Sequence, residues 1–284
     1  MERHGLVSVI MPVYNGIPLI KASIRSLLNQ SYENWECIIV NDGSTDGTKE
    51  FLDSLKNKRF VIHHFNKNLG RPQARQMGLD LAKGEFLAML DADDLYHKEK
   101  LTIQVNAMRE NPEIYLIGSG LCSFGTNVDF IRVRYKGDGI IHDFNINEPF
   151  PLSHAPSMLR REHAIKFKYN PSLKLGQDID FLRRYLNGKK YINLPNVFYY
   201  YSEFDSVNKS KIRKAYKIYT KKFFVAKEYQ LSALYALKFM FGYIVYPFIN
   251  INEILKIRGD IPSNLELRDY HEYCDSIIKK MDEL

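Results

Sequence analysis

Three carboxylates lie within four residues, Asp91-Ala92-Asp93-Asp94, directly after an apolar run over residues 86–90. Carboxylates this close repel one another unless a cation or hydrogen-bond donors neutralise them. Hard oxygen ligands of this kind suit Mg²⁺ or Mn²⁺, and substrate phosphates usually complete the coordination shell. The alternative is an acidic helix N-terminus, since a helix is expected to follow over residues 95–109. Three acids exceed what a cap needs, which favours a metal site.

Two more polar clusters follow apolar runs. One is Pro12-Val13-Tyr14-Asn15-Gly16, and the other is the turn-like segment 41–48, with two Gly, two Asp, one Ser and two Thr. Taken alone, the second is a turn before a helix, with Ser44 or Thr45 as the N-cap. In a functional interpretation, Asp42 accepts hydrogen bonds from a nucleobase edge or a ribose hydroxyl.

Residues 68–75, NLGRPQAR, precede another predicted helix. Gly70 allows the backbone to approach an anion closely at a helix start, and Arg71 or Arg75 can pair with phosphate oxygens. One of these two arginines can equally be a surface residue, and the sequence does not distinguish them.

The second half of the chain offers fewer candidates. Asp178 and Asp180 follow Gly176, and either is a candidate general base or a helix cap. His154 is a candidate ligand of a metal or a diphosphate, although a lone histidine is more often structural.

The elements that must position these residues are predicted from the apolar periodicity. Short runs of four to six residues, typical of strands buried on both faces of a parallel sheet, are found at 6–11, 37–40, 60–65, 86–90 and 114–117. Helical segments lie between them at 18–29, 47–56, 72–83 and 98–109. This alternation predicts an open, doubly wound α/β sheet. Since ligands bind beyond the carboxyl ends of such strands, the three polar clusters should share one edge.

Residues 121–204 are less periodic and are expected to continue the same domain and cover one edge of the sheet. A half-exposed strand is predicted over 128–135, a short helix over 178–186 and another strand over 191–201. The composition changes after Asp205, which divides the chain into a domain over 1–204 and a helical region over 205–284.

The region after Asp205 is basic and then apolar. Eight Lys or Arg and no acid occur over 206–227, whereas residues 229–251 contain one charge, Lys238. An anionic membrane surface attracts such a sequence, and Tyr235, Tyr243 and Tyr246 would lie at the headgroup level of an interfacial helix. A spanning helix is disfavoured because Lys238 would sit mid-membrane. Packing against the catalytic domain or a second subunit is the other interpretation.

The composition is globular. Of 284 residues, 45% are hydrophobic and 26% charged, and the formal net charge of +7 favours anionic partners. Cys37, Cys122 and Cys274 are odd in number and far apart, which excludes a disulfide framework and a CxxC metal pair. Because no signal peptide is recognised at the N-terminus, a reduced, intracellular location is expected.

Four segments together resemble the family 2 glycosyltransferases of GT-A fold, bacterial enzymes that extend surface polysaccharides. They are VSVIMPVYNG (7–16), WECIIVNDGSTDGT (35–48), NLGRPQARQMGLDLAKGEFLAMLDADD (68–94) and GQDIDFLRR (176–184). The resemblance implies a doubly wound, mostly parallel sheet flanked by helices. Beyond Asp205 it implies nothing specific.

The resemblance also assigns expected roles to residues. Pro12 and Tyr14 would line the nucleotide pocket and Asp42 would contact the base, while Gly70 and Arg75 would lie near the ribose and diphosphate. Asp91 and Asp93 would form the DxD element, with Asp93 the more direct ligand of Mn²⁺ or Mg²⁺ and Asp91 nearer the ribose. Asp178 would be the catalytic base of a Glu-Asp pair in which Gln177 replaces the usual Glu.

The implied reaction is inverting transfer of a sugar from a nucleotide donor, with UDP favoured, to a saccharide acceptor. The basic, apolar tail suggests a lipid-linked acceptor, for example on undecaprenyl diphosphate, in O-antigen or capsule synthesis. We expect peripheral contact with the cytoplasmic face of the inner membrane and no nucleic acid partner. The sequence leaves the oligomeric state open.

Other classes fit less well. A sugar-1-phosphate nucleotidyltransferase usually needs a Gly- and Arg-rich loop after the first strand, which Tyr14-Asn15-Gly16-Ile17-Pro18 does not provide. The chain has neither the GxGxxG fingerprint after that strand nor a GxxxxGK[ST] phosphate loop. A basic nucleic-acid-binding module is disfavoured because the basic residues concentrate at 209–227 rather than alternating with aromatic ones.

Overall fold

The computed structural model describes residues 5–124, 132–173, 175–203, 217, 220, 229–244, 260–262 and 264–278. The chain divides into two compact units. The first comprises Met1–Cys122, Tyr135–Tyr201 and Pro262–Leu284, and the second comprises Ser123–Arg134 and Ser202–Ile261. All of the candidate site residues belong to the first unit.

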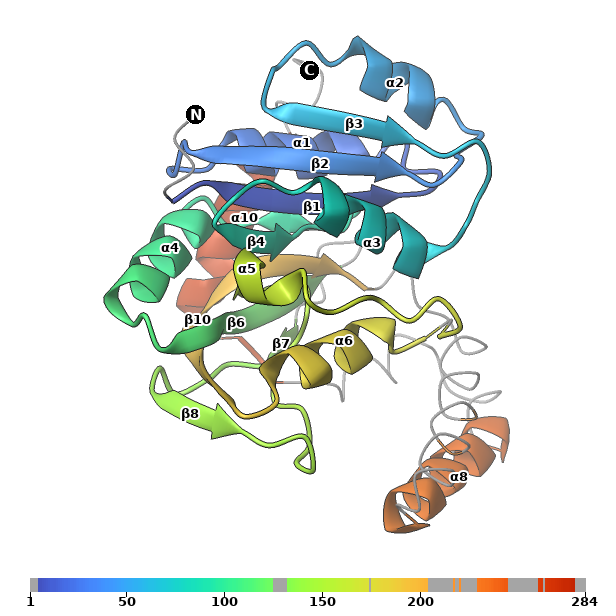
Figure 1. Ribbon diagram of the computed structural model, residues 1–284, viewed down its shortest axis with the longest axis vertical. Helices are drawn as coiled ribbons and strands as arrows, with labels where there is room; N and C mark the ends of the chain where they lie inside the picture. Colours follow the sequence, from blue (N-terminus) through green and yellow to red (C-terminus); the bar gives the residue numbers. More distant parts are fainter. Residues whose placement is uncertain are drawn as a thin grey trace. The chain divides into compact units, whose positions relative to one another are not determined.

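Four parallel strands form the N-terminal half of the sheet (Figure 1). They are β1 (Val7–Val13), β2 (Trp35–Asn41), β3 (Phe60–His64) and β4 (Phe86–Met89), arranged in the order β3-β2-β1-β4. Their register aligns Val13 with Asn41 and Ile10 with Met89. The carboxyl ends of β1, β2 and β4 therefore meet at one edge, as the apolar runs predict.

Helices cover both faces of these strands. They are α1 (Ile20–Leu28), α2 (Thr48–Ser54), α3 (Arg71–Leu81) and α4 (Lys100–Glu110). Alternate residues of β1 enter different hydrophobic clusters: Val9 packs in the cluster that contains α1, and Ile10 packs in the cluster that contains α3. Burial on both faces explains why the strands are continuously apolar.

Helix α3 lies unusually close to β1 because of a glycine. A side chain at Gly78 would overlap Ile10, so only glycine permits this approach. The close packing places the N-terminal end of α3, which carries Arg75, beside the ends of the central strands.

The second half of the sheet is mixed. It contains β5 (Leu95–Tyr96), β6 (Ile114–Phe124), β8 (Ile141–Phe144), β9 (Met158–Arg160) and β10 (Lys189–Ser202), with helices α5 (Arg161–Ala164) and α6 (Gln177–Leu186). Strand β9 lies antiparallel between β4 and β6. The predicted α/β class is confirmed, and the antiparallel strands complete a mixed sheet.

The helix predicted over 98–109 is confirmed as α4, which begins at Lys100. The alternative, a helix that begins at Leu95 directly after the acids, is wrong, because Leu95–Tyr96 forms the short strand β5, paired with β10. The acids at 91–94 are thus separated from α4 by a strand, and they do not cap that helix.

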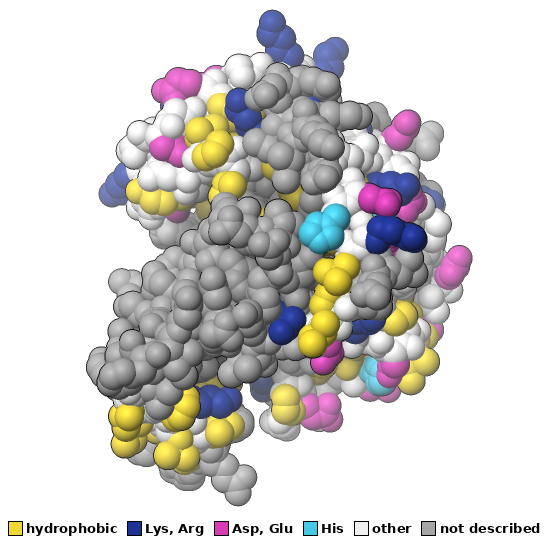
Figure 2. All heavy atoms as spheres, turned by 180° about the vertical axis from the view of Figure 1, so that it is seen from behind, with side chains coloured by type: hydrophobic (Ala, Val, Ile, Leu, Met, Phe, Trp, Pro, Cys, Tyr) yellow, Lys and Arg dark blue, Asp and Glu magenta, His cyan; other side chains and the backbone are white. Residues whose placement is uncertain are grey.

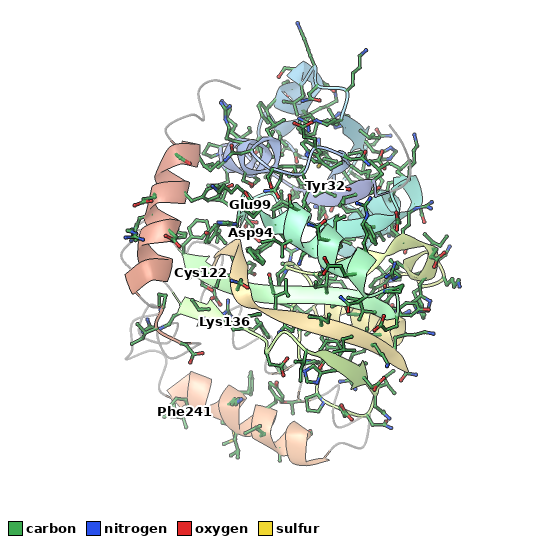
Figure 3. The ribbon with its side chains drawn as sticks, turned by 90° about the vertical axis from the view of Figure 1, so that its left-hand side faces the viewer. Tyr32, Asp94, Glu99, Cys122, Lys136 and Phe241 are labelled. Carbon is green, nitrogen blue, oxygen red and sulfur yellow. The ribbon has the colours of Figure 1, made fainter. Side chains whose placement is uncertain are left out.

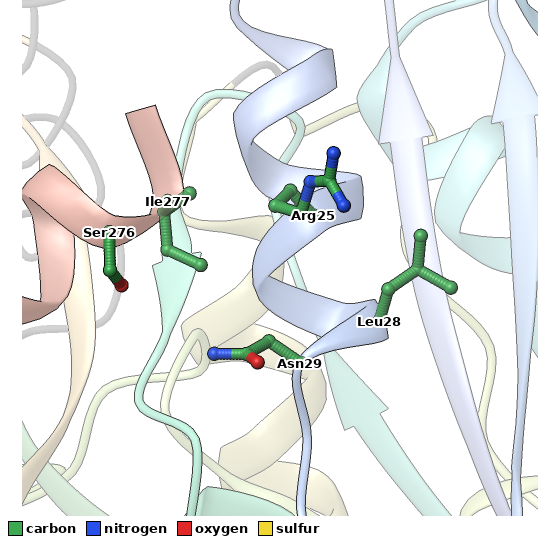
Figure 4. Close-up of a pocket in the computed structure, with 5 residues that line it drawn as sticks. All are labelled: Arg25, Leu28, Asn29, Ser276 and Ile277. Atoms are coloured by element: carbon green, nitrogen blue, oxygen red, sulfur yellow. The ribbon is translucent and has the colours of Figure 1, made fainter. Parts of the chain in front are cut away.

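The C-terminal helix α10 (Asn264–Ile278) belongs to the first unit. Tyr270 packs on Tyr200 with ring centroids 5.1 Å apart, and Tyr273 packs on His97 at 5.7 Å. A small pocket lies between α10 and α1, lined by Arg25, Leu28, Asn29, Ser276 and Ile277 (Figure 4). The region expected over 205–284 therefore includes a helix that packs in the first unit.

The second unit contains β7 (Arg132–Arg134) and α8 (Tyr229–Ile244). Arg134 pairs with Glu203 at 2.7 Å, and Val133 pairs with Asp260 through their backbones. Most of the strand predicted over 128–135 and most of the basic segment over 206–227 lie outside the described residues, as do residues 245–251. Among the residues that are described, no helix combines the length and the apolarity needed to cross a bilayer.

Candidate active site

The loops that follow β1 and β2 are joined to each other by hydrogen bonds. The backbone amides of Asn15 and Gly16 donate to Ser44 Oγ (2.8 Å) and Thr48 Oγ1 (2.9 Å). In return, the amide of Thr45 donates to Asn15 Oδ1 at 2.8 Å. Tyr14, at the end of β1, is 51% exposed beside these contacts. The two loops thus form one wall of the candidate site at the carboxyl ends of the strands. The aromatic side chain of Tyr14 is exposed there.

Asp42 connects this wall to the start of α3. Its carboxylate is buried and accepts hydrogen bonds from the amides of Leu69 (2.6 Å) and Gly70 (2.9 Å). Asp42 and Gly70, which are 28 residues apart, therefore lie together, as the shared-edge hypothesis requires. Pro12 is half-buried in β1 opposite Val40. Asp42 therefore has a structural role, because it bonds the backbone just before α3, in addition to the contact with a nucleobase that was expected from the sequence.

Arg75 and Asp91 form a mostly buried ion pair at the centre of the edge. Arg75 Nη2 lies 3.1 Å from Asp91 Oδ1, and the two side chains are 4% and 20% exposed. Burial lowers the pKa of Arg75, but the attraction of Asp91 and then Asp178 outweighs it and raises the pKa. Nε and Nη1 of this arginine are buried and have no hydrogen-bond partner among the residues that the structure describes. Arg75, rather than the exposed Arg71, is thus the cation held at the site.

His154 lies in the same cluster. Its Nε2 is 2.9 Å from the hydroxyl of Tyr169, and its Nδ1 is buried with no hydrogen-bond partner in the described ranges. Burial, followed by the positive charge of Arg75, lowers the pKa of His154 to about 3, although Asp178 and Asp91 oppose this shift. The imidazole is therefore neutral at physiological pH, with a proton on one ring nitrogen and a lone pair on the other.

Asp178 is presented by the first turn of α6. Gly176 precedes this helix in the left-handed conformation (φ 72°), which favours glycine. Asp178 is half-buried, and its Oδ1 accepts a hydrogen bond from the amide of Ile179 at 2.9 Å. Asp180 instead pairs with Arg184 at 2.8 Å. The structure thus brings Asp178, and not Asp180, into the electrostatic neighbourhood of Arg75 and His154.

The neighbour of Asp178 is also unusual. Gln177 is buried, and its Oε1 has no hydrogen-bond partner in the described part of the chain. An unpaired buried carbonyl oxygen is costly in a folded protein, and such groups concentrate at functional sites.

The acids of the DADD segment have separate environments. Asp94 is fully buried, and its Oδ2 accepts a hydrogen bond from the hydroxyl of Tyr199 at 2.6 Å (Figure 3). The same hydroxyl accepts a hydrogen bond from the amide of Asp91 at 3.2 Å. Asp93 is only half-buried. Asp94 therefore shapes the turn, and Asp91 pairs with Arg75, so the acids of this segment do not act as one group.

A divalent cation fits this donor set only together with a substrate. Within the described ranges, no three His, Cys, Asp or Glu side chains gather closely enough to hold a metal ion. The buried, unpartnered Nδ1 of His154 and the half-buried carboxylate of Asp93 are suitable donors, and Mn²⁺ and Mg²⁺ commonly complete their shell with phosphate oxygens.

Two residues of this site carry no signal in the sequence. Tyr169 orients His154 and stacks on Phe181 of α6, with centroids 4.2 Å apart, and Tyr199 holds Asp94 from β10. Neither tyrosine is near its partner in the chain. Only the paired strands and packed helices bring them together.

Comparison with known proteins identifies the class to which this chain belongs. The model of the family "Glycosyl transferase family 2" matches residues 8–167, more than half of the chain. The chain belongs to glycosyltransferase family 2.

Two curated relatives give the comparison more detail. TuaG of Bacillus subtilis, named for teichuronic acid biosynthesis, is 41% identical over 107 residues, which cover 37% of this chain and 42% of TuaG. WfgD of Escherichia coli, a UDP-Glc:α-D-GlcNAc-diphosphoundecaprenol β-1,3-glucosyltransferase, is 39% identical over 118 residues, which cover 40% of this chain and 45% of WfgD. The match spans less than half of either relative, and less than a fifth of three Rickettsia relatives.

The fold also matches solved structures. Staphylococcus aureus TarS (residues 1–349) superposes with a TM-score of 0.61 at 20% identity, covering 88% of this chain and 77% of that one. TarS has been crystallised with UDP and with UDP-GlcNAc. The similarity confirms the GT-A fold, and relatives such as TuaG and WfgD belong to cell-surface polysaccharide synthesis.

Proposed function

We propose that this chain is an inverting, metal-dependent glycosyltransferase that moves a sugar from a UDP-sugar to a saccharide acceptor. The main support for this proposal is the cluster formed by Arg75, Asp91, His154 and Asp178. A buried cation, a neutral imidazole and a half-buried carboxylate gather there, at the edge where Tyr14 is exposed.

The donor would bind across this edge. Tyr14 and Pro12 would contact the base, with Asp42 and Gly70 beside it. The support is that hydrogen bonds join the loop after β1 to the loop after β2, and Asp42 to Gly70, in one continuous wall. The unsatisfied donors of Arg75 would face the diphosphate, since guanidinium groups bind phosphate oxygens well. The TarS complexes with UDP and UDP-GlcNAc support UDP as the nucleotide.

Asp93 and His154 would hold Mn²⁺ or Mg²⁺, with Asp91 adjacent to them. When bound, a divalent cation supplies Lewis-acid stabilisation of the negative charge on the departing diphosphate. Tyr169 would keep the Nε2 proton of His154 on its own side, which leaves Nδ1 as the ligand atom.

Asp178 would act as the general base. The acceptor hydroxyl oxygen attacks the anomeric carbon while the bond from that carbon to the phosphate oxygen breaks, and the hydroxyl proton passes to the Asp178 carboxylate. UDP leaves with the bonding electron pair. A single direct displacement of this kind inverts the anomeric centre. The fixed charge of Arg75 would stabilise the diphosphate as charge develops there.

We further propose that the acceptor is a saccharide linked to a lipid diphosphate, in the synthesis of an O-antigen or capsule. Support comes from the diphosphoundecaprenol acceptor in the name of WfgD and from the basic segment over 206–227. With this acceptor, the enzyme would act at the cytoplasmic face of the inner membrane. No nucleic acid partner is proposed.

The test is a screen of nucleotide sugars with Mn²⁺ or Mg²⁺, which measures nucleotide release and then transfer to a synthetic lipid-diphosphate monosaccharide. We expect release of UDP that depends on the metal, and a product whose anomeric configuration by NMR is opposite to that of the donor. Retained configuration would contradict the inverting mechanism. Formation of UTP and a sugar phosphate from pyrophosphate would identify a nucleotidyltransferase instead.

A further inference from the structure

Helix α8 exposes several large hydrophobic side chains. Five large hydrophobic side chains are between 44% and 66% exposed: Leu234, Leu237, Met240, Phe241 and Ile244. Positions 234, 237, 241 and 244 fall on one stripe of a helix with 3.6 residues per turn. We name these five residues the α8 face. It is visible as a group of hydrophobic side chains in Figure 2, and Phe241 is labelled in Figure 3.

The opposite side of α8 is the one that is covered. Ser232 is 6% exposed and donates a hydrogen bond to the carbonyl of Thr220 at 3.0 Å. Tyr235, Ala236 and Phe239 are half-buried on that same side. A helix that is covered on one side and exposes five large hydrophobic residues elsewhere presents a surface suited to a partner outside its own unit.

The charged residues in the sequence of α8 and just before it are mostly basic. Residues 229–244 contain Lys238 as their only charged residue, and the preceding segment over 206–228 contains eight basic residues and one acidic residue, Glu228. Lys238 Nζ lies 5.2 Å from the ring centroid of Tyr235. A lysine above an aromatic ring at the border of an apolar surface is the arrangement found where helices meet lipid headgroups.

We propose that the α8 face docks on an anionic lipid membrane, with the helix lying in the plane of the headgroups and its five hydrophobic side chains inserted. The basic residues complement the anionic headgroups. With 16 residues, α8 does not span a bilayer, whereas an interfacial helix needs only an apolar side and cationic flanks.

A second copy of the chain is a less suitable partner for the α8 face than a lipid surface. The footprint of one side of a 16-residue helix is on the order of a few hundred Å², against roughly 800 Å² per partner in a standard stable interface. A lipid surface requires no such minimum area, because the apolar chains enter a continuous medium.

The test is cosedimentation with vesicles, which needs neither donor nor acceptor substrate. Vesicles of phosphatidylcholine alone are compared with an equimolar mixture of phosphatidylcholine and phosphatidylglycerol. The variant is Leu237→Glu/Phe241→Glu, in which both changes are at exposed positions. The matched control is Ile140→Glu, because Ile140 is 57% exposed outside α8. Circular dichroism and melting curves verify that each variant is folded.

We expect the unchanged protein to sediment with the anionic vesicles, the double variant to lose binding on the order of tenfold or more, and Ile140→Glu to bind normally. Lys238→Gln should weaken binding to anionic vesicles at low salt. Unchanged binding of the double variant would overturn the proposal. So would an absence of vesicle binding by the unchanged protein, or a dimer in analytical ultracentrifugation that the double variant dissociates.

Discussion

The hydroxyl of Tyr169 lies 2.9 Å from Nε2 of His154, while the Tyr169 ring stacks on Phe181 of α6 at 4.2 Å. The amide of Tyr169 also donates to Gln76 of α3 at 3.0 Å. Tyr169 therefore links the helix that carries Asp178 and the neutral histidine through its side chain, and the helix that carries Arg75 through its backbone amide. Its hydroxyl determines which nitrogen of His154 is left for a ligand.

Tyr169→Phe removes this hydroxyl and keeps the stacked ring. We expect the Mn²⁺ concentration for half-maximal UDP release to rise by about 10- to 100-fold, as is typical when the partner of a metal-binding histidine is lost. Metal titration of activity, supported by Mn²⁺ binding measured by electron paramagnetic resonance, provides the readout. Tyr32→Phe is the control, since the hydroxyl of Tyr32 bonds the carbonyl of Gly5 away from the site. Equal metal dependence of both variants would remove His154 from the ligand set.

Asp178→Asn tests the base. Transfer should fall by roughly a hundredfold to ten-thousandfold because the amide cannot accept the proton, while UDP binding by calorimetry should persist. The matched variant Asp180→Asn alters an acid two residues away that pairs with Arg184, and it should keep most activity. Near-normal turnover of Asp178→Asn would refute the assignment.

The adjacent acids Asp93 and Asp94 should respond differently. Asp94→Ala leaves the buried hydroxyl of Tyr199 without this acceptor and should reduce the free energy of unfolding by about 1–3 kcal/mol. Asp93→Ala should change stability less and raise the metal requirement more. Denaturant unfolding and metal titration of the two variants, side by side, distinguish the roles. A larger loss of stability in Asp93→Ala and a higher metal requirement in Asp94→Ala would exchange the roles assigned to the two acids.

The Arg75–Asp91 pair should make the free energy of unfolding depend on pH in the acidic range. Burial raises the pKa of Asp91, but Arg75, with Arg71 and His154, outweighs it and holds the pKa below its ordinary value. The resulting stabilisation is complete above the unfolded pKa of about 3.9 and is lost as pH falls through the lower folded-state pKa. Unfolding curves from neutral to acidic pH should show this loss, and Asp91→Asn should diminish it.

Removing one partner of this pair should be more harmful than removing both. Arg75→Met leaves Asp91 largely buried and should cost up to about 3–5 kcal/mol, reduced by the 20% exposure of that side chain. The double variant Arg75→Met/Asp91→Leu should recover part of the loss. If the two losses simply add in denaturant unfolding, the pair is not energetically coupled.

Lys100 should also make stability rise with pH, but in a more alkaline range than the Arg75–Asp91 pair. It is fully buried, donates to Gln104 Oε1 at 2.7 Å and lies 4.2 Å from the Tyr96 ring centroid. Burial lowers the pKa of Lys100 to about 7. Because the unfolded side chain stays protonated up to about pH 10.4, folding releases this proton and stability rises between the two values. Lys100→Met should remove that rise, whereas Lys98→Met, at an exposed position, should not.

The sequence predicts the elements best where burial is on both faces. The runs that became β1 and β2 are apolar because each of their sides enters a cluster, and their ends at Val13 and Asn41 differ from the predicted ends by two residues or fewer. The helix expected from Leu95 fails because the two residues of β5 are too few to show a period. Their strand character comes from pairing with β10, which lies a hundred residues away.

The candidate site was only partly predictable for a similar reason. Motif residues such as Asp91 and Asp178 stand in recognisable segments, so their approach to one edge could be expected. The choice of Arg75 over Arg71 depends on which one the packing of α3 buries, and the participation of Tyr169 depends on a contact across 15 residues. Both of these features are decided by three-dimensional packing and not by the local sequence pattern.

The hydrogen bonds between the loops after β1 and β2 bear on protein engineering. Because Asn15 and Gly16 bond to Ser44 and Thr48, and Thr45 bonds back to Asn15, the two loops cannot be exchanged one at a time without leaving polar groups unmatched. Chimeras designed to alter donor choice should therefore transplant both loops from the same parent as a single cassette.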